Sequence, residues 1–190
     1  MIKAIFLAAG QSKRIKYENK LVKRYKKTPL INHSLKVLHK SKVNKVIIVL
    51  GHQHKEVKKI ILKNKKNIFI YNKDYKKGMA SSIKVGLKKV ARNDKGFIVV
   101  QSDMPFIKVS DINKIYNSIK LKKFLVYVLK FKNKIGNPIG FDISLTKKFK
   151  KIKGEYGAKF MVKRLKNRTN FIKVKSIKVF KDFDLIKDFN

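Results

Sequence analysis

The strongest constraint on how this chain folds is the alternation of short apolar runs with longer segments of helical periodicity. The runs are rich in β-branched and aromatic residues and fall at 3–7, 45–50, 67–71, 96–101 and 124–131. This alternation is typical of βαβ units in a mainly parallel sheet. We therefore expect a single-domain three-layer α/β/α sandwich with a Rossmann-like, mostly parallel sheet and a site at the carboxyl ends of the strands.

The segments between these runs indicate where the helices lie. Pro29 precedes an amphipathic stretch, since proline suits a first helical turn, and either Ser110 or Asp111 can cap a later helix. Further helices are expected through Val57 and Ile61, over 81–90 and over 156–165. In the last third, 137–141 predicts a turn and short strand, and 171–180 is strand-like. Because no linker or repeat divides residues 1–190, we expect one domain.

Composition excludes several classes of protein. The chain has 190 residues and no cysteine, so disulfide frameworks, thiolate nucleophiles and cysteine zinc sites are excluded. Its apolar runs are far shorter than the roughly 20 residues of a membrane helix, and no apolar stretch typical of a signal peptide follows Met1. A cytoplasmic protein without membrane association is the expectation.

The formal net charge of +39 raises the alternative of a nucleic-acid-binding module. However, the lysines are spread evenly along the chain, and only five of the 50 basic residues are arginine. A dedicated nucleic-acid surface more often concentrates its charge and uses arginine, whose planar fork binds phosphates and guanine in a bidentate way. We therefore interpret most lysines as solvated, and a nucleic-acid partner is disfavoured.

The loop after the first strand carries the clearest chemical signal. Residues 7–14 read LAAGQSKR, and Lys20 follows. Small residues at a strand exit let backbone N–H groups approach phosphate oxygens, and the cations that follow suit a triphosphate. Neither a Walker A loop nor a GxGxxG fingerprint is present. From the residues alone, a tight strand exit in a lysine-rich chain remains an alternative.

Asp103 is a second candidate, since it follows the buried run 96–101 and lies two residues before Pro105. A carboxylate at a strand end can hold Mg²⁺ between phosphates. The alternative is an aspartate that caps a turn before proline. His52 and His54 could form a metal pair, but with only Glu56 nearby a solvated pair is the simpler interpretation.

Together these motifs resemble the MobA-like nucleotidyltransferase family, and most closely the molybdenum cofactor cytidylyltransferases. The family patterns LAAGxSxRM, GMSSSLxxGL, D(Q/M)P, GHPxxF, GDxGAR and DIDTPEDL are similar to residues 7–15, 78–87, 103–105, 136–141, 154–159 and 182–189. The patterns occur in the family's order, with Lys20 after the first and Asn72 before the second. The resemblance divides the domain into a nucleotide half, about 1–105, and an acceptor half, about 106–190.

The resemblance also implies roles for individual residues. The catalytic residues would be Arg14, Lys20 and Asp103. The nucleotide would be bound by Leu7, Ala8, Ala9, Gly10, Gln11, Ser12, Arg14, Lys20, Asn72, Gly78, Ser81 and Ser82. Asp103 and Asp182 would hold the metal, with Asp184 or Glu155 as alternatives to Asp182. The acceptor side would include Asn137, Pro138, Glu155 and Lys159.

The implied reaction is transfer of CMP from CTP to a phosphorylated acceptor, most closely the molybdopterin molybdenum cofactor, with release of pyrophosphate. Mg²⁺ or Mn²⁺ would be the cofactor, and a molybdoenzyme or its chaperone a protein partner. Ala8 and Ala9 before Gly10 are the form that the family associates with pyrimidine nucleotides, which favours CTP over GTP. Nucleotidyl transfer to a sugar or alditol phosphate is the alternative among enzymes.

Overall fold

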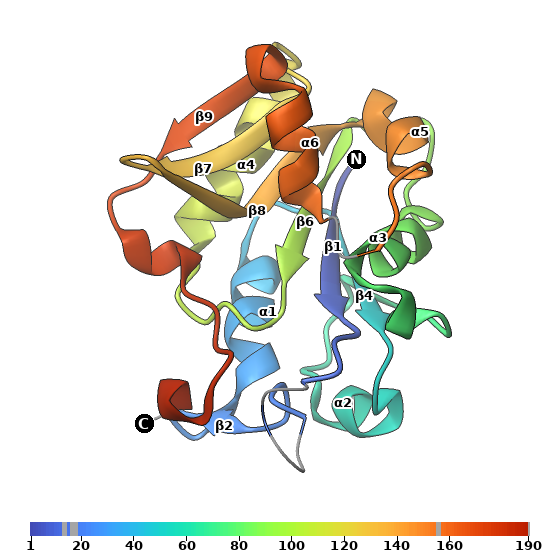
Figure 1. Cartoon of the computed structure of the whole chain (residues 1–190), viewed down its shortest axis with the longest axis vertical. Coiled ribbons are helices and arrows are strands. Elements are labelled where there is room, and N and C mark those ends of the chain that lie inside the picture. The colour runs from blue at the N-terminus through green and yellow to red at the C-terminus, as the bar shows by residue number, and fades with distance from the viewer. Residues whose placement is uncertain (13–14, 16–18, 155–156, 190) are drawn as a thin grey trace.

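The computed structural model describes residues 1–12, 15, 19–154 and 157–189, which form a seven-stranded sheet in the order β5-β4-β1-β6-β8-β7-β9 (Figure 1). The strands of this sheet are β1 (Ile2–Ala8), β4 (Lys45–Leu50), β5 (Asn67–Tyr71), β6 (Gly96–Gln101), β7 (Val126–Phe131), β8 (Lys134–Asp142) and β9 (Thr169–Lys173). β5, β4, β1 and β6 are parallel to one another, whereas β8 runs antiparallel to both β6 and β7. The predicted mostly parallel sheet is therefore confirmed.

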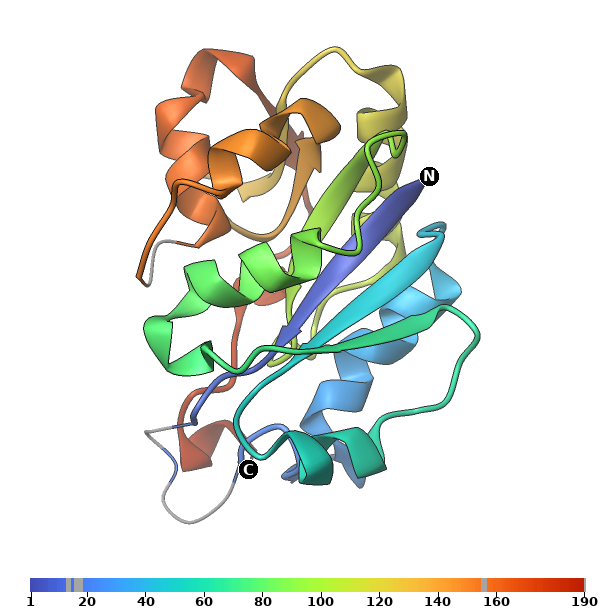
Figure 2. The ribbon, with the colours of Figure 1, turned by 90° about the vertical axis from the view of Figure 1, so that its right-hand side faces the viewer.

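Helices cover both faces of the sheet, as the edge-on view in Figure 2 shows. On one face lie α1 (Leu30–Lys40) and α4 (Val109–Leu121); on the other lie α3 (Met79–Leu87), α5 (Thr146–Phe149) and α6 (Ala158–Arg164). A short helix, α2 (His54–Ile60), follows β4. The structure thus has the three predicted layers.

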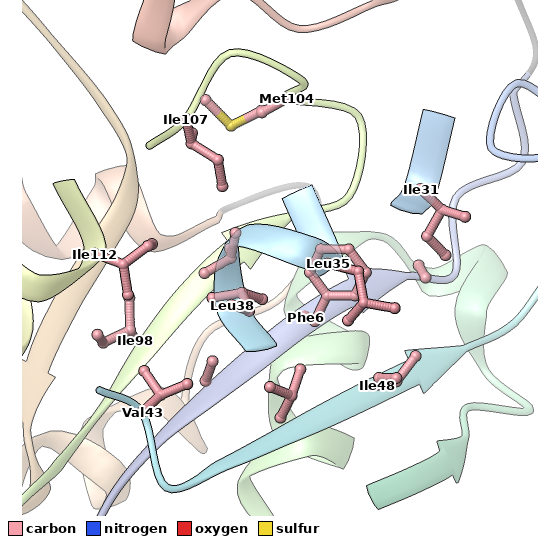
Figure 3. Packing of buried hydrophobic residues seen from close by; sticks show 14 of the residues in the cluster. Phe6, Ile31, Leu35, Leu38, Val43, Ile48, Ile98, Met104, Ile107 and Ile112 are labelled. Atoms are coloured by element: carbon pink, nitrogen blue, oxygen red, sulfur yellow. The ribbon is translucent and has the colours of Figure 1, made fainter. Parts of the chain in front are cut away.

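Two apolar clusters, one on each face, hold the layers together. Figure 3 shows the first, in which Leu35 and Leu38 of α1 pack over the sheet beside Phe6 of β1. All three side chains are fully buried. Burying each such side chain stabilises the fold by about 1.5–3 kcal/mol. The packed strands thereby bring the carboxyl ends of β1, β4 and β6 to one edge of the sheet.

Several element boundaries differ from the prediction. The strand-like stretch 171–180 is β9, which ends at Lys173, followed by a 3₁₀ helix, η4 (Ile177–Phe180). The Ser176 hydroxyl accepts the N–H of Lys178 and starts this turn, which buries Val179 and Phe180. A hairpin of β2 (Arg24–Tyr25) and β3 (Thr28–Pro29) was not expected, because two-residue strands have no apolar alternation to reveal them.

Helix starts also shift by a few residues. α3 begins at Met79, before the predicted 81, because Gly78 has φ +92° and turns the chain there. The N-cap of α4 is Lys108 and not Ser110 or Asp111; Asp111 lies in the first turn, and its carboxylate accepts the N–H of Lys108 at 3.0 Å. None of the helices in the described ranges is both long and apolar enough to span a membrane.

Candidate active site

A cavity of about 430 Å³ opens at the carboxyl ends of β1 and β6, where the sequence predicts the site. Its lining comes from the end of β1 and the loop after it, residues 20–21, residues 75–82 around the start of α3, the end of β6 with the two residues that follow, and one residue of the C-terminal segment. The lining residues are Leu7, Ala9, Gly10, Gln11, Ser12, Lys20, Leu21, Tyr75, Gly78, Met79, Ser82, Gln101, Ser102, Asp103 and Asp184.

Polar contacts join Ser12, which follows β1, to residues 19–21. The Ser12 hydroxyl accepts the N–H of Lys20 at 3.1 Å and donates to Oδ1 of Asn19 at 3.3 Å. Asn19 Oδ1 also accepts the N–H of Leu21 at 3.0 Å. These bonds fix Lys20 beside the loop. Ser12 and Asn19 are therefore supports for Lys20, a role that the sequence did not reveal.

Lys20 lies between two carboxylates. Its Nζ is 2.7 Å from Asp103 Oδ2 and 2.7 Å from Asp184 Oδ1. Burial alone would lower the pKa of Lys20, but the two ion pairs outweigh it and hold that pKa above its usual 10.5. The ammonium is therefore fully charged at neutral pH.

Opposing effects act on the pKa of Asp103. Burial raises its pKa above the usual 3.8, the charge of Asp182 adds to this, and Lys20 opposes it. The second oxygen, Oδ1, is buried and has no hydrogen-bond partner among the described residues. A buried carboxylate oxygen without a partner is costly in a protein interior. Asp103 can thus accept a further cation.

The carboxylates of Asp103 and Asp184 fit a divalent metal ion. Among the described residues no three His, Cys, Asp or Glu side chains cluster to form a complete metal cage. Mg²⁺ is commonly held by one or two carboxylates, with substrate phosphates and water completing its shell. Asp103 and Asp184 match that donor set, and the unpartnered Oδ1 of Asp103 is the observation that supports it.

The choice between Asp182 and Asp184 follows from the C-terminal segment, which Figure 1 shows in red beside β2. Phe183 is 1% exposed, packs at 4.8 Å from the Tyr25 ring centroid, and donates its N–H to the carbonyl of Asp103 at 3.0 Å. With Phe183 anchored inward, Asp184 reaches Lys20, whereas Asp182 is exposed and does not line the cavity. Of the three predicted candidates, Glu155 lies outside the described residues, and of Asp182 and Asp184 only Asp184 lines the cavity.

The Asp188 carboxylate completes this arrangement. Its Oδ2 accepts the N–H groups of Asp184 and Leu185, both at 2.9 Å. These bonds hold the pKa of Asp188 below its usual 3.8, together with the nearby Lys181. Asp188 therefore stays ionised and fixes the backbone turn that presents Asp184.

At the start of α3 the predicted nucleotide residues divide into two groups. Ser82 and Gly78 line the cavity. Asn72 is buried behind them and donates through Nδ2 to the hydroxyls of Ser81 at 2.9 Å and Ser82 at 3.0 Å. The Ser81 hydroxyl lies 2.8 Å from the Gly78 carbonyl. Asn72 and Ser81 thus hold the helix start in place and do not face the cavity; Ala8 likewise packs in the core.

Of the predicted acceptor residues, the three that the structure describes, Asn137, Pro138 and Lys159, do not line the cavity. Asn137 is buried and precedes a cis peptide bond to Pro138. Lys159 is exposed and is not part of the cavity lining. Asn137 does contact a lining residue, because its Nδ2 donates to Oε1 of Gln101 at 2.7 Å. The sequence did not single out Gln101 or Tyr75, although the position of Gln101, two residues before Asp103, was a possible signal.

Two predicted residues, Arg14 and Glu155, lie outside the described residues. The rings of His52 and His54 lie against two different tyrosines, Tyr75 and Tyr71, with centroids 5.9 and 4.4 Å apart. Most of the predicted nucleotide loop, together with Lys20 and Asp103, nevertheless meets in one cavity.

Comparison with known proteins gives consistent matches. The family pattern of the MobA-like NTP transferase domain matches residues 4–169. Bifunctional protein GlmU from Campylobacter fetus subsp. fetus is 32% identical over 117 residues, covering 60% of this chain. The chain spans only 26% of the length of that relative.

Solved structures share the fold over nearly the whole chain. Rv0371c from Mycobacterium tuberculosis H37Rv superposes with a TM-score of 0.87 at 20% identity, covering 99% of this chain and 95% of that one. The 4-diphosphocytidyl-2C-methyl-D-erythritol synthase from Anaerococcus prevotii superposes with a TM-score of 0.77 at 16% identity, covering 99% and 92%. Rv0371c has also been solved in complex with manganese.

Proposed function

Because the chain belongs to the MobA-like NTP transferase family, we propose that it transfers a nucleoside monophosphate from a nucleoside triphosphate to a phosphorylated acceptor. An oxygen of the acceptor attacks the α-phosphorus, the bond between the α- and β-phosphates breaks, and pyrophosphate leaves. The single observation that carries this proposal is the placement of Lys20 between Asp103 and Asp184, beside the loop after β1.

The residues present suit this chemistry because phosphoryl transfer needs positioning and charge neutralisation more than a protein nucleophile. The backbone N–H groups of residues 9–12 would bind the β- and γ-phosphates, together with Arg14. Lys20 would neutralise charge at the α-phosphate, which requires its ammonium to leave the two carboxylates when substrate binds. Ser82 would contact the ribose or the base from the start of α3.

Asp103 and Asp184 would hold Mg²⁺ or Mn²⁺. When bound, the metal ion would supply positive charge that stabilises the phosphate groups of the nucleotide. Asp184 replaces Asp182 in this role because it shares Lys20 with Asp103. The manganese complex of the structural neighbour Rv0371c supports a divalent ion in this fold.

CTP is the proposed nucleotide, since Ala8 and Ala9 precede Gly10 as in the pyrimidine-specific members that the sequence resembles. The molybdopterin molybdenum cofactor is the proposed acceptor, which would make a molybdoenzyme or its chaperone the recipient of the product. A sugar or alditol phosphate is the second candidate acceptor. An alditol phosphate is a candidate because the chain has the fold of a synthase whose name specifies a diphosphocytidyl alditol.

The test is a nucleotide screen followed by an acceptor screen. Calorimetry with Mg²⁺ compares CTP, GTP, UTP and ATP, and we expect CTP to bind most tightly. Pyrophosphate release is then measured with the molybdenum cofactor, glucose 1-phosphate and an alditol phosphate as acceptors. Tight CTP binding without release of pyrophosphate when the molybdenum cofactor is present would reject that acceptor. No release of pyrophosphate with any of the three acceptors would contradict the proposed activity.

A further inference from the structure

The cavity contains a polar side chain that the proposed roles do not use. Gln101 ends β6 and lines the cavity together with Asp103 and Lys20. We propose that Gln101 binds the phosphorylated acceptor and that Asn137 is its positioning residue. This inference rests on the proposed nucleotidyl transfer, and it concerns how the same site recognises its second substrate.

The pairing of β6 with β8 brings the two side chains together. These strands are antiparallel, with Val99 opposite Ile139, so the same register places 101 opposite 137. Asn137 is only 6% exposed, and its Nδ2 donates to Gln101 Oε1 at 2.7 Å. This bond turns the Oε1 of Gln101 toward Asn137, and it leaves the buried Oδ1 of Asn137 without a hydrogen-bond partner among the described residues.

That orientation determines what Gln101 presents. With Oε1 turned to Asn137, the amide nitrogen carries two N–H donors, and no hydrogen bond from them to a described residue is formed. A donor in a cavity favours an acceptor oxygen on a ligand or water, because an unmade hydrogen bond is costly. Gln101 therefore offers an uncharged pair of donors beside Asp103.

The position of these donors favours the acceptor over the nucleotide. The loop at 9–12 follows β1, whereas Gln101 is tied to β8, the neighbour of β6 on the opposite side from β1. Ser82 and Gly78 already occupy the α3 side of the cavity. Lys20 already supplies the cation for a triphosphate. The matching ligand is a small phosphorylated molecule whose phosphate or hydroxyl oxygen lies next to Asp103.

The test separates the two substrates. Pyrophosphate release is measured with saturating CTP and Mg²⁺ while the molybdenum cofactor is varied, and again with glucose 1-phosphate; CTP binding is measured separately by calorimetry. Gln101→Leu removes the donors and should raise the KM for the acceptor about 10- to 100-fold, with the Kd for CTP unchanged within about twofold. Circular dichroism and thermal unfolding check that the variant folds.

Two further variants distinguish recognition from mere packing. Gln101→Glu keeps an oxygen facing Asn137 but has no donor and adds a negative charge, so it should impair the acceptor KM at least as much as Gln101→Leu. The Asn137→Asp carboxylate cannot donate to Oε1 of Gln101. It would accept an N–H of the Gln101 amide, which turns the amide nitrogen away from the cavity. It should therefore raise the acceptor KM as well, and adding it to Gln101→Leu should have little further effect.

Three outcomes would overturn the inference. The first is an acceptor KM for Gln101→Leu within twofold of wild type, and the second is a Kd for CTP that weakens by the same factor as the acceptor KM. The third is a double variant whose loss equals the product of the two single losses. Wild-type protein that releases no pyrophosphate with these two acceptors or with an alditol phosphate contradicts the proposed function and this inference together. Active wild type with an unaffected Gln101→Leu contradicts the inference alone.

Discussion

Lys20→Met should have two opposite effects on the site: it should tighten the binding of a divalent metal ion and slow turnover. The ammonium lies 2.7 Å from one oxygen of Asp103 and 2.7 Å from one of Asp184, where it competes with a divalent cation for the same carboxylates. Methionine has similar length and no charge. In the variant, the two carboxylates face each other without their cation.

The magnitude follows from the exposure of the two pairs. The side chains of Lys20 and Asp103 are each 14% exposed, whereas that of Asp184 is 35% exposed and partly screened by solvent. Breaking both pairs to admit a metal ion costs about 1–3 kcal/mol, between the values for exposed pairs and for buried pairs. Removing that cost should tighten Mn²⁺ binding about 10- to 100-fold without nucleotide. Turnover should nevertheless fall about 10²- to 10³-fold, because the charge at the α-phosphate is no longer neutralised.

Mn²⁺ binding is measured by calorimetry on the nucleotide-free protein, and turnover by pyrophosphate release. Lys36→Met is the matched control, since Lys36 is exposed on α1 away from the cavity, and it should change neither quantity. Mn²⁺ binding to Lys20→Met no tighter than to wild type would refute the competition between ammonium and metal. Turnover at the wild-type rate would refute the role of Lys20 on the phosphate.

Three further predictions concern stability and position. Burial would raise the pKa of Asp94, but ion pairing and a backbone N–H hold it below 3.8, so this carboxylate stabilises the fold above about pH 4 and loses that effect as pH falls through the lowered pKa. Asp94→Asn should cost about 3 kcal/mol of unfolding free energy at pH 7, by urea denaturation, and progressively less in acid; an equal loss at all pH values would contradict this. Phe183→Ala should cost about 3–5 kcal/mol and weaken Mn²⁺ binding by displacing Asp184, whereas destabilisation with unchanged Mn²⁺ affinity would argue against the anchor. Ser81→Ala should cost about 1 kcal/mol of stability and leave CTP affinity intact, while Ser82→Ala should weaken CTP binding severalfold; calorimetry showing the reverse order would contradict their assigned positions.

The repeating part of the fold was predictable because its signal is local. Each parallel strand is an apolar run, and each helix between them has its own periodicity, so β1, β4, β5 and β6 agree with the prediction within a few residues. The prediction of a strand through residue 180 was wrong after Lys173, because buried Val179 and Phe180 are apolar in a 3₁₀ turn as they would be in a strand. Tertiary packing decides between the 3₁₀ turn and the strand, and local sequence propensity does not record it.

The site was predictable to the same extent. Lys20 and Asp103 follow strand ends, where a motif can reveal them. Asp184 could not be separated from Asp182 by sequence, because the burial of Phe183 against a distant aromatic ring decides which carboxylate turns inward. The contact of Gln101 with Asn137 could not be predicted from the sequence, because it depends on the antiparallel register of β6 and β8.

Asp103→Asn tests the central claim most directly. The claim is that the Asp103 carboxylate, with Lys20 and Asp184, forms a centre for nucleotidyl transfer. Wild-type protein should release pyrophosphate from CTP with Mg²⁺ and the acceptor identified by screening. The near-isosteric Asp103→Asn should fold normally by circular dichroism and yet lose at least about 10²-fold in rate. Release of pyrophosphate by Asp103→Asn at the wild-type rate would contradict the account.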